Sequence, residues 1–248
     1  MVKAFTKKYT LNFKFLAGTS RGTLKTKDSW FLKLIDENGN TGYGEAGPLK
    51  GLSSEFGEDL GKVMKETLLN LQGDPLQMLK KIEADYSLPS TVKFALESAL
   101  IDLINGGEQK LFDNDFSNSR ASIPINGLIW MGDYDFMHQQ LEKKIKEGFS
   151  CIKFKIGAIN FEDELQLLKS VRENYSKNEI IIRVDANGAF EYDDALDKVK
   201  ALAELDVHSI EQPIKAGNWE LMQKLIQNSS LDIALDEELI GIRELTEK

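Results

Sequence analysis

IIIRVDANGAF, residues Ile180–Phe190, is the stretch that indicates the fold most strongly. Its three isoleucines and Val184 form a nearly continuous β-branched run, which is typical of a strand buried on both faces. Asp185, Asn187 and Gly188 then break the apolar pattern. The stretch therefore predicts a buried strand that carries Asp185 at its carboxyl end.

The runs around this stretch follow the same plan. Two later apolar runs also end in acidic residues, and one earlier run, 151–157, carries lysines near its end. Predicted strands at 123–130, 151–156, 180–185, 209–212 and 233–236 alternate with predicted helices at 134–147, 161–174, 193–205 and 219–227. Such alternation predicts a parallel sheet, either a (β/α) TIM-type barrel or an open doubly wound sheet with a reversal of strand order. The unit length favours the barrel, of which about five of the eight strands are encoded.

The first 112 residues have a different pattern. Predicted strands at 9–15, 30–35 and 41–46 come first, with a flexible segment at 17–27, an Asn-Gly hairpin turn at 37–40 and a loop at 47–54. Helical periodicity then takes over and predicts three helices, of which the first covers about 60–71, the second begins near Pro75 and the third follows Ser90. Strands followed by helices predict an α+β domain over residues 1–112, joined to the barrel domain over 113–248.

Composition narrows the classes of partner. The formal net charge of −9, from 31 basic and 40 acidic side chains, argues against nucleic acid. A single cysteine excludes an intramolecular disulfide and a metal site built from several cysteines. The sequence contains no apolar run of the length of a signal peptide core or a membrane span, so we expect a cytoplasmic protein without a membrane partner.

Charged residues at the predicted strand ends form the candidate site. Lys155, Asp185, Glu211 and Asp236 should face one another, because the carboxyl ends of parallel barrel strands converge on one pocket. Three carboxylates brought together repel strongly unless a cation lies among them. Oxygen ligands of this kind suit Mg²⁺, with Mn²⁺ as the alternative ion. The sequence therefore predicts a metal centre.

Two lysines extend this chemistry. Lys153 and Lys155 are two residues apart on a strand and must point to the same face. Because Ile152, Phe154 and Ile156 face the outer helices, the lysines should face the interior. Beside a divalent cation their pKa values would fall, which makes a lysine a usable general base near neutral pH. The pair predicts abstraction of a proton next to a carboxylate held by the metal.

The order of these motifs resembles the enolase superfamily, and most closely its muconate-lactonizing subgroup. The spacings from Lys155 to Asp185, Glu211 and Asp236 are 30, 26 and 25 residues. The motifs that carry the resemblance are Lys153-Phe154-Lys155, Asp185-Ala186-Asn187, Glu211-Gln212-Pro213 and Asp236-Glu237. The strand at 42–46 is similar to part of the superfamily's N-terminal capping domain. The resemblance implies that residues 1–112 cap the barrel.

Within the subgroup, the motifs look most like the o-succinylbenzoate synthase family of menaquinone biosynthesis. This resemblance implies a carbon–oxygen lyase with a small carboxylate as substrate. Lys155 would take the proton α to the carboxylate and return it to the departing hydroxyl, and Lys153 would help to hold the substrate. The implied Mg²⁺ ligands are Asp185, Glu211 and Asp236. The implied substrate contacts are Asn187, Arg21 and Ser53, the last two from capping loops at 18–27 and 47–54.

One departure from the family pattern keeps alternatives open. The family has a second active-site lysine on the sixth barrel strand, whereas this sequence ends 12 residues after Asp236. We therefore expect a C-terminally truncated chain whose uncovered sheet edge is exposed to pairing, so an oligomer is an alternative state. A dipeptide epimerase of the L-Ala-D/L-Glu type, or an N-acylamino acid racemase, is the second enzymatic hypothesis. A non-catalytic fragment is the hypothesis of another class.

Overall fold

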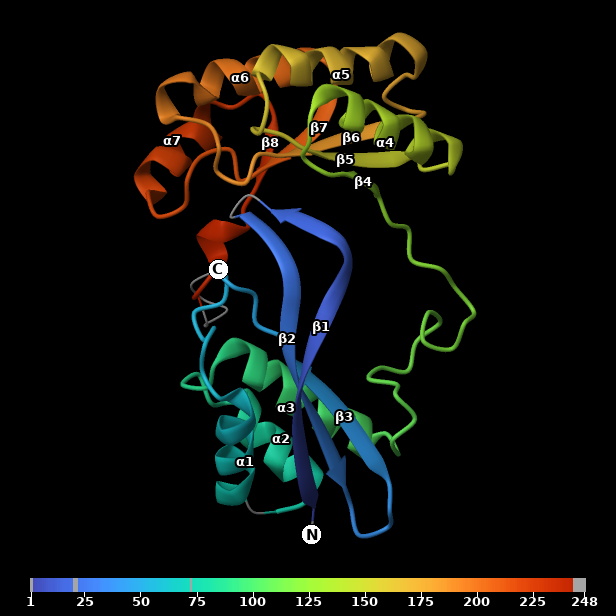
Figure 1. Ribbon diagram of the computed structural model, residues 1–248, viewed down its shortest axis with the longest axis vertical. Coiled ribbons are helices and arrows are strands. Elements are labelled where there is room, and N and C mark those ends of the chain that lie inside the picture. Colours follow the sequence, from blue (N-terminus) through green and yellow to red (C-terminus); the bar gives the residue numbers. More distant parts are fainter. Residues whose placement is uncertain (1, 20–21, 72, 243–248) are drawn as a thin grey trace. The chain divides into compact units, whose positions relative to one another are not determined.

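The computed structural model describes residues 2–19, 22–71 and 73–242 (Figure 1). It divides into two compact units, which are described separately. Unit 1 comprises Met1–Ala17 and Arg21–Ile123, and unit 2 comprises Gly18–Ser20 and Pro124–Lys248. The boundary after residue 112 that the sequence suggests stays a prediction, because residues 113–123 form neither a helix nor a strand.

Unit 1 contains a three-stranded sheet in the order β1-β2-β3. The strands are β1 (Lys3–Thr19), β2 (Gly22–Ile35) and β3 (Thr41–Ala46). The predicted Asn-Gly turn joins β2 to β3 in antiparallel register, with Ile35 opposite Thr41. The Asp36 carboxylate accepts the backbone N–H groups of Asn38 at 2.9 Å and Asn40 at 2.8 Å, and Gly39 takes a φ of +87°. The prediction of a tight hairpin here is confirmed.

The flexible segment predicted at 17–27 is wrong for most of its length. β1 continues to Thr19 and β2 begins at Gly22, so residues 17–19 and 22–27 lie in strands, and residues 20–21 are outside the described residues. Gly, Ser, Thr and Lys gave no clear alternation in this segment, and its order comes from pairing with a strand elsewhere in the chain. Strand propensity depends strongly on such context, which composition does not reveal.

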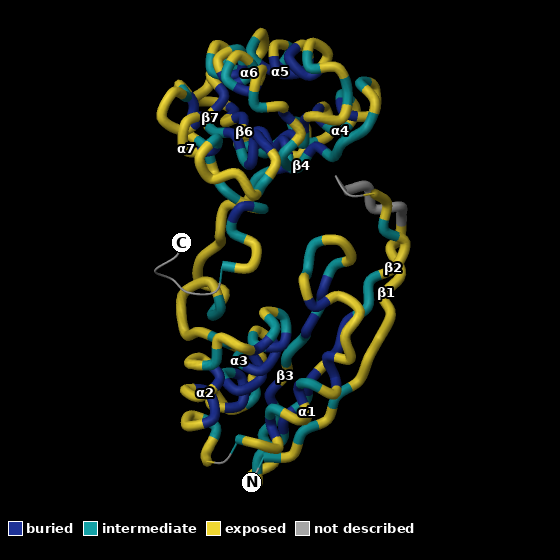
Figure 2. Tube along the Cα trace, turned by 90° about the vertical axis from the view of Figure 1, so that its left-hand side faces the viewer, coloured by how far each residue is buried: buried dark blue, intermediate teal, exposed yellow. Residues whose placement is uncertain are grey.

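Three helices pack on one face of this sheet: α1 (Leu60–Asn70), α2 (Pro75–Glu83) and α3 (Ser90–Ile104). Gly42 and Gly44 explain how closely α3 approaches β3, because a Cβ atom on either glycine would collide with the carbonyl oxygen of Ala99 or Ala95. Buried residues are concentrated along this contact (Figure 2). The α+β organisation predicted for this part of the chain is thus present.

Unit 2 alternates strands and helices from end to end. Its strands are β4 (Gly127–Ile129), β5 (Cys151–Lys155), β6 (Ile181–Asp185), β7 (Val207–Glu211) and β8 (Asp232–Ala234). Its helices are α4 (Tyr134–Lys146), α5 (Phe161–Asn174), α6 (Tyr192–Glu204), α7 (Trp219–Asn228) and the short 3₁₀ helix η1 (Glu237–Leu239). All four strand pairings are parallel and the order is β4-β5-β6-β7-β8. The described strands therefore lack the reversal of order that a doubly wound sheet requires.

Alternate residues of the unit 2 strands face opposite sides of the sheet. Ile152, Phe154, Ile182, Val184 and Ile210 are buried against the helices, with α5 and α6 covering this side in Figure 1. The other side carries the charged residues of the same strands, as the sequence predicted for Lys153 and Lys155. The apolar side builds the core, which leaves the polar side free for chemistry.

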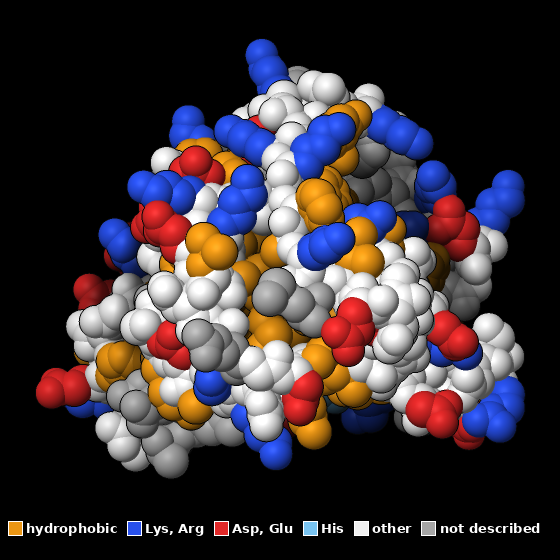
Figure 3. All heavy atoms as spheres, turned by 90° about the horizontal axis from the view of Figure 1, so that it is seen from below, with side chains coloured by type: hydrophobic (Ala, Val, Ile, Leu, Met, Phe, Trp, Pro, Cys, Tyr) orange, Lys and Arg blue, Asp and Glu red, His pale blue; other side chains and the backbone are white. Residues whose placement is uncertain are grey.

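The outer surface agrees with the mixed charge of the sequence. The face in Figure 3 carries apolar, basic and acidic side chains next to one another. Among the described residues, no helix combines the length and apolar character needed to cross a bilayer.

Candidate active site

The carboxyl ends of three neighbouring strands bring charged residues into one row. In the sheet register Lys155 lies opposite Asp185, and Asp185 lies opposite Glu211. Two pairs earlier, Lys153 lies opposite Arg183. Because these strands are parallel, their ends lie at one edge of the sheet, as the sequence analysis expected.

Ion pairs connect the row. Lys153 Nζ lies 2.8 Å from Asp185 Oδ2 and 2.7 Å from Glu211 Oε2, so one ammonium group bridges two carboxylates. Lys155 Nζ lies 2.6 Å from the same Asp185 oxygen. The Asp185 side chain is fully buried, whereas those of Lys153 and Lys155 remain 20% and 27% exposed. A buried carboxylate thus holds two lysines that are accessible from the open side of the sheet.

The ion pairs between Lys153, Lys155 and Asp185 shift the pKa values of Lys153 and Asp185. Burial alone would lower the pKa of Lys153, but its hydrogen bonds to Asp185 and Glu211 outweigh that effect and raise the pKa. Burial likewise opposes ionisation of Asp185, yet Lys153 and Lys155 lower its pKa below the usual value. The predicted fall in the pKa of Lys153 depended on a neighbouring cation. That prediction concerns Lys153 beside a bound ion and stays a prediction.

Glu211 and Asp236, the other two predicted metal ligands, have raised pKa values, whereas that of Asp185 is lowered. Burial and the charge of Asp185 raise the pKa of Glu211, although Lys153 opposes them. Burial and the charges of Glu237 and Asp185 raise the pKa of Asp236. Burial is the largest cause of both shifts, and the charges of neighbouring carboxylates add to it. Such a cluster would attract a cation.

The donor chemistry fits Mg²⁺, because Asp185, Glu211 and Asp236 offer carboxylate oxygens alone. Lys153 lies between Asp185 and Glu211, so a positive charge is already held between two of these carboxylates. Within residues 2–19, 22–71 and 73–242, however, no three His, Cys, Asp or Glu side chains are gathered closely enough to hold a metal ion. The residues match the ion in type and charge without forming a closed coordination sphere.

The three predicted substrate contacts have different surroundings. Asn187 accepts a hydrogen bond from Lys155 Nζ at 2.9 Å and donates one to Glu237 Oε1 at 3.2 Å, so its side chain joins the cluster. Ser53 Oγ accepts the backbone N–H of Leu49 at 3.0 Å and closes a turn within unit 1. Arg21 lies outside the described residues. The substrate roles of all three stay predictions.

Sequence reasoning missed several polar residues that support the strand ends. Glu164 is buried on α5 and accepts the backbone N–H groups of Gly157 at 2.6 Å and Ala158 at 3.2 Å, directly after the lysine strand. Gln212 and Glu238 are buried next to two predicted metal ligands. The sequence offered one signal for them, because Gln212 follows Glu211 and Glu238 belongs to the acidic run 236–238. It does not show which of these side chains point inward.

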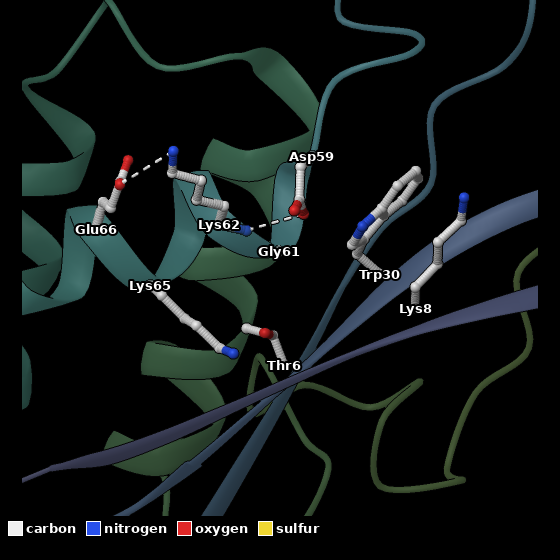
Figure 4. A pocket seen from close by; sticks show the side chains of 8 residues that line it. All are labelled: Thr6, Lys8, Trp30, Asp59, Gly61, Lys62, Lys65 and Glu66. Atoms are coloured by element: carbon white, nitrogen blue, oxygen red, sulfur yellow. Dashed lines mark hydrogen bonds and ion pairs between the residues drawn. The ribbon is translucent and has the colours of Figure 1, made fainter.

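A separate pocket in unit 1 is a less complete site. It has a volume of about 420 Å³ and lies beside the start of α1, with Lys8, Trp30 and Lys65 among its lining residues (Figure 4). Asp59 accepts the backbone N–H of Lys62 at 3.1 Å as a helix cap, and the Lys62 side chain pairs with Glu66 at 3.8 Å. These contacts already engage its acidic groups. The strand-end cluster is therefore the stronger candidate.

Comparison with known proteins agrees with this choice. Residues 137–247 match the family model described as "Enolase C-terminal domain-like". The chain is 41% identical to an o-succinylbenzoate synthase from Desulfotalea psychrophila over 260 aligned residues. The alignment covers 94% of this chain and 70% of that protein. A solved structure from the same organism, described as MenC, aligns with a TM-score of 0.76 at 36% identity over 97% of this chain and 72% of that one.

More distant relatives show other activities and a bound metal. An N-succinyl-L-Arg/Lys racemase from Bacillus cereus is 26% identical over 91% of this chain and 63% of its own length. The structure of an o-succinylbenzoate synthase from Thermosynechococcus elongatus, complexed with Mg in its active site, aligns with a TM-score of 0.74 at 24% identity, over 94% of this chain and 68% of that one. The chain thus spans between three fifths and three quarters of these proteins. On its identity to the Desulfotalea protein, the chain belongs to the enolase superfamily of enzymes.

Proposed function

We propose that this chain acts as a Mg²⁺-dependent lyase that forms o-succinylbenzoate by removing water from a hydroxylated carboxylic acid, in the menaquinone pathway of the cytoplasm. The observation that carries the proposal is Lys155, held 2.6 Å from Asp185 at the open edge of the sheet. The 41% identity to an o-succinylbenzoate synthase supports the choice of reaction. Residues 1–112 would form the capping domain, and the five-stranded sheet would be part of a (β/α) barrel.

Each residue of the cluster has a proposed role. Lys155, in its neutral form, would take the proton α to the substrate carboxylate and then give it to the leaving hydroxyl, so that one C–H and one C–O bond break and water departs. Lys153 would contact the substrate carboxylate. Asp185, Glu211 and Asp236 would hold Mg²⁺, which when bound stabilises negative charge that develops on the substrate carboxylate. Asn187 would orient Lys155 through its hydrogen bond of 2.9 Å.

Sequence identity favours dehydration over racemisation, because the relative at 41% identity is an o-succinylbenzoate synthase and the racemase is 26% identical. Racemisation requires two bases on opposite faces of the α-carbon, whereas a syn dehydration uses a single base. Lys153 and Lys155 lie on one face of one strand, so they approach a substrate from the same side. The similarity to the Bacillus cereus racemase keeps racemisation of an N-succinylamino acid as the second candidate.

The direct test combines the chain with MgCl₂ and the hydrated precursor of o-succinylbenzoate and follows the absorbance of the aromatic product. We expect product that depends on Mg²⁺ and disappears in EDTA. Incubation of an N-succinylamino acid in D₂O tests the second candidate, because racemisation would introduce deuterium at the α-carbon. Mg²⁺ binding without product from either substrate would contradict both reactions and favour the non-catalytic alternative.

A further inference from the structure

Gln212 has an unusual environment at the carboxyl end of β7. Its side chain is fully buried, although glutamine is mostly found on protein surfaces. Its backbone adopts a φ of +41°, in the left-handed region that residues other than glycine rarely occupy. A backbone conformation of this kind persists when the surrounding contacts over-determine it. The contacts of Gln212 therefore need an explanation.

Every polar group of this side chain has a partner. Oε1 accepts the backbone N–H groups of Asp236 at 3.1 Å and Glu238 at 3.2 Å. Nε2 donates to the Ile214 carbonyl at 3.0 Å and to Glu238 Oε2 at 2.9 Å. Glu238, also buried, uses its other oxygen to accept the Gly217 N–H at 2.8 Å. We call Gln212 and Glu238, with these bonds, the amide clamp.

The clamp begins where the sheet ends. The last pair between β7 and β8 joins Glu211 to Ala234, and one further backbone bond runs from Gln212 N to the Ala234 carbonyl at 2.9 Å. Asp236 lies two residues beyond that pair, so no neighbouring strand takes its N–H. The Gln212 side chain accepts this N–H instead, and thereby extends the connection between β7 and β8 past the end of the ladder.

Two predicted ligands are linked through this contact. Gln212 follows Glu211 directly in the chain, and its side chain binds the backbone of Asp236. Both oxygens of Glu238 already accept hydrogen bonds, from Gln212 and from Gly217, so this acid supports its neighbours while its own carboxylate is engaged. The clamp thus fixes the backbone of Asp236 against Gln212, the residue that follows Glu211.

We propose that Gln212 and Glu238 are positioning residues that fix the backbone of Asp236 relative to Glu211 and thereby raise the affinity of the chain for Mg²⁺. The inference rests on the proposed function, in which Asp236 and Glu211 are ligands. Residues that orient metal ligands through hydrogen bonds typically contribute about 10–100-fold to metal affinity. Without the clamp, the backbone N–H of Asp236 would lose its hydrogen bond to Gln212 Oε1, and Asp236 would be less ordered before the ion binds.

An exchange of the two side-chain types tests the clamp. Gln212→Glu places two carboxylates against each other and removes the amide donor, so the Kd for Mg²⁺ should rise about 10–100-fold. Adding Glu238→Gln restores the donor and acceptor between the two side chains with their places exchanged, although the Ile214 carbonyl stays without its donor, so the Kd should return part of the way to the wild-type value. Calorimetric titration of the full chain with MgCl₂ measures these values, and thermal unfolding without metal checks that each variant folds.

Two further variants serve as comparisons for Gln212→Glu. Glu238→Gln alone preserves size but replaces one of the two accepting oxygens by a donor, so it loses one of the bonds from Gln212 and Gly217 and should weaken Mg²⁺ binding less than Gln212→Glu does. Gln140→Glu is the matched control. Gln140 also uses both ends of its amide, accepting from Trp130 N at 3.0 Å and donating to Trp130 O at 3.1 Å, but at β4, which carries no acid. Its Kd for Mg²⁺ should stay unchanged.

The outcomes separate this inference from the proposed function. If the wild type and Gln212→Glu bind Mg²⁺ equally while Asp236→Asn weakens binding, the positioning role is refuted and the metal site stands. If Gln140→Glu weakens binding as much as Gln212→Glu, the effect is general destabilisation and the inference also fails. A wild-type chain that binds no Mg²⁺ would refute the proposed function and this inference together.

Discussion

Charged side chains lie at both ends of the unit 2 sheet, but their binding partners differ between the two ends. At the amino-terminal end, Arg172 donates to the backbone carbonyls of Leu205 and Ile180 at 2.9 Å, Asp206 at 3.1 Å and Tyr175 at 3.3 Å. At the carboxyl end, lysines pair with carboxylates that can change protonation or partner. We therefore expect the first end to serve stability and the second to serve chemistry, which is the division found in parallel (β/α) barrels.

The largest effect should come from Lys155→Ala at the chemical end. Removing a general base typically costs about 10²–10⁴-fold in rate, so turnover should fall by that factor while the unfolding midpoint changes little. Steady-state product formation at saturating Mg²⁺ measures this. Turnover that survives the substitution would show that another group is the base.

Arg172→Met should have the opposite profile. It leaves four backbone carbonyls without their charged donor, of which that of Ile180 belongs to a buried residue, and we expect the free energy of unfolding to fall by about 1–3 kcal/mol. The Kd for Mg²⁺ should stay the same, because no residue of the cluster loses a contact. Urea denaturation and calorimetry measure the two quantities, and Arg172→Lys should be intermediate, since lysine lacks the guanidinium fork. A large change in Mg²⁺ affinity would contradict the proposal that the amino-terminal end serves stability and the carboxyl end serves chemistry.

A pH effect should appear in the metal-free chain. Burial and the charges of Glu237 and Asp185 raise the pKa of Asp236 in the folded state. Folding then favours the protonated acid, so the contribution is present below the unfolded pKa of about 3.9 and is lost as pH rises through the raised value. Asp185 acts in the other direction, because its lowered pKa gives a contribution that is lost as pH falls.

Asp236→Asn should therefore reduce the loss of stability as pH rises above about 4. Denaturation in EDTA at a series of pH values compares the variant with the wild type. Identical slopes for the two proteins would mean that Asp236 ionises as freely in the folded chain as in the unfolded one.

The smallest effect should come from Lys177→Ala, next to Arg172. Lys177 Nζ pairs with Asp206 at 2.8 Å, but both side chains are more than half exposed. Exposed pairs of this kind contribute little, because water screens the charges and the long side chain loses freedom. Neither stability nor turnover should change measurably. A clear loss in either would mean that the amino-terminal end is more sensitive than its contacts suggest.

Much of unit 2 could be predicted because its signals are local. The apolar run before Asp185 and the period of the helix at 161–174 each indicate an element without knowledge of the rest of the chain, and α5 has the predicted bounds. β1 and β2 were harder, since their outer parts become strands through pairing with each other. That pairing is not visible in the composition of either segment.

The candidate site was predictable in its residue types and less so in its contacts. Parallel strands force Lys155, Asp185 and Glu211 to one edge, so their proximity follows from the fold. The bridging of two carboxylates by Lys153 depends on side-chain reach. The clamp of Gln212 and Glu238 depends on how the backbone turns after the strand ends, which the sequence does not specify.

The strand order of unit 2 also has a consequence for how the chain folds. Among the described residues, each strand from β4 to β8 pairs with strands that are its neighbours in sequence. These pairings join residues 23–30 positions apart, so each one can form as soon as the next strand is available, although parallel pairing itself is slow. We therefore expect the sheet to grow strand by strand during synthesis, with each new βα segment docking on the one that left the ribosome before it.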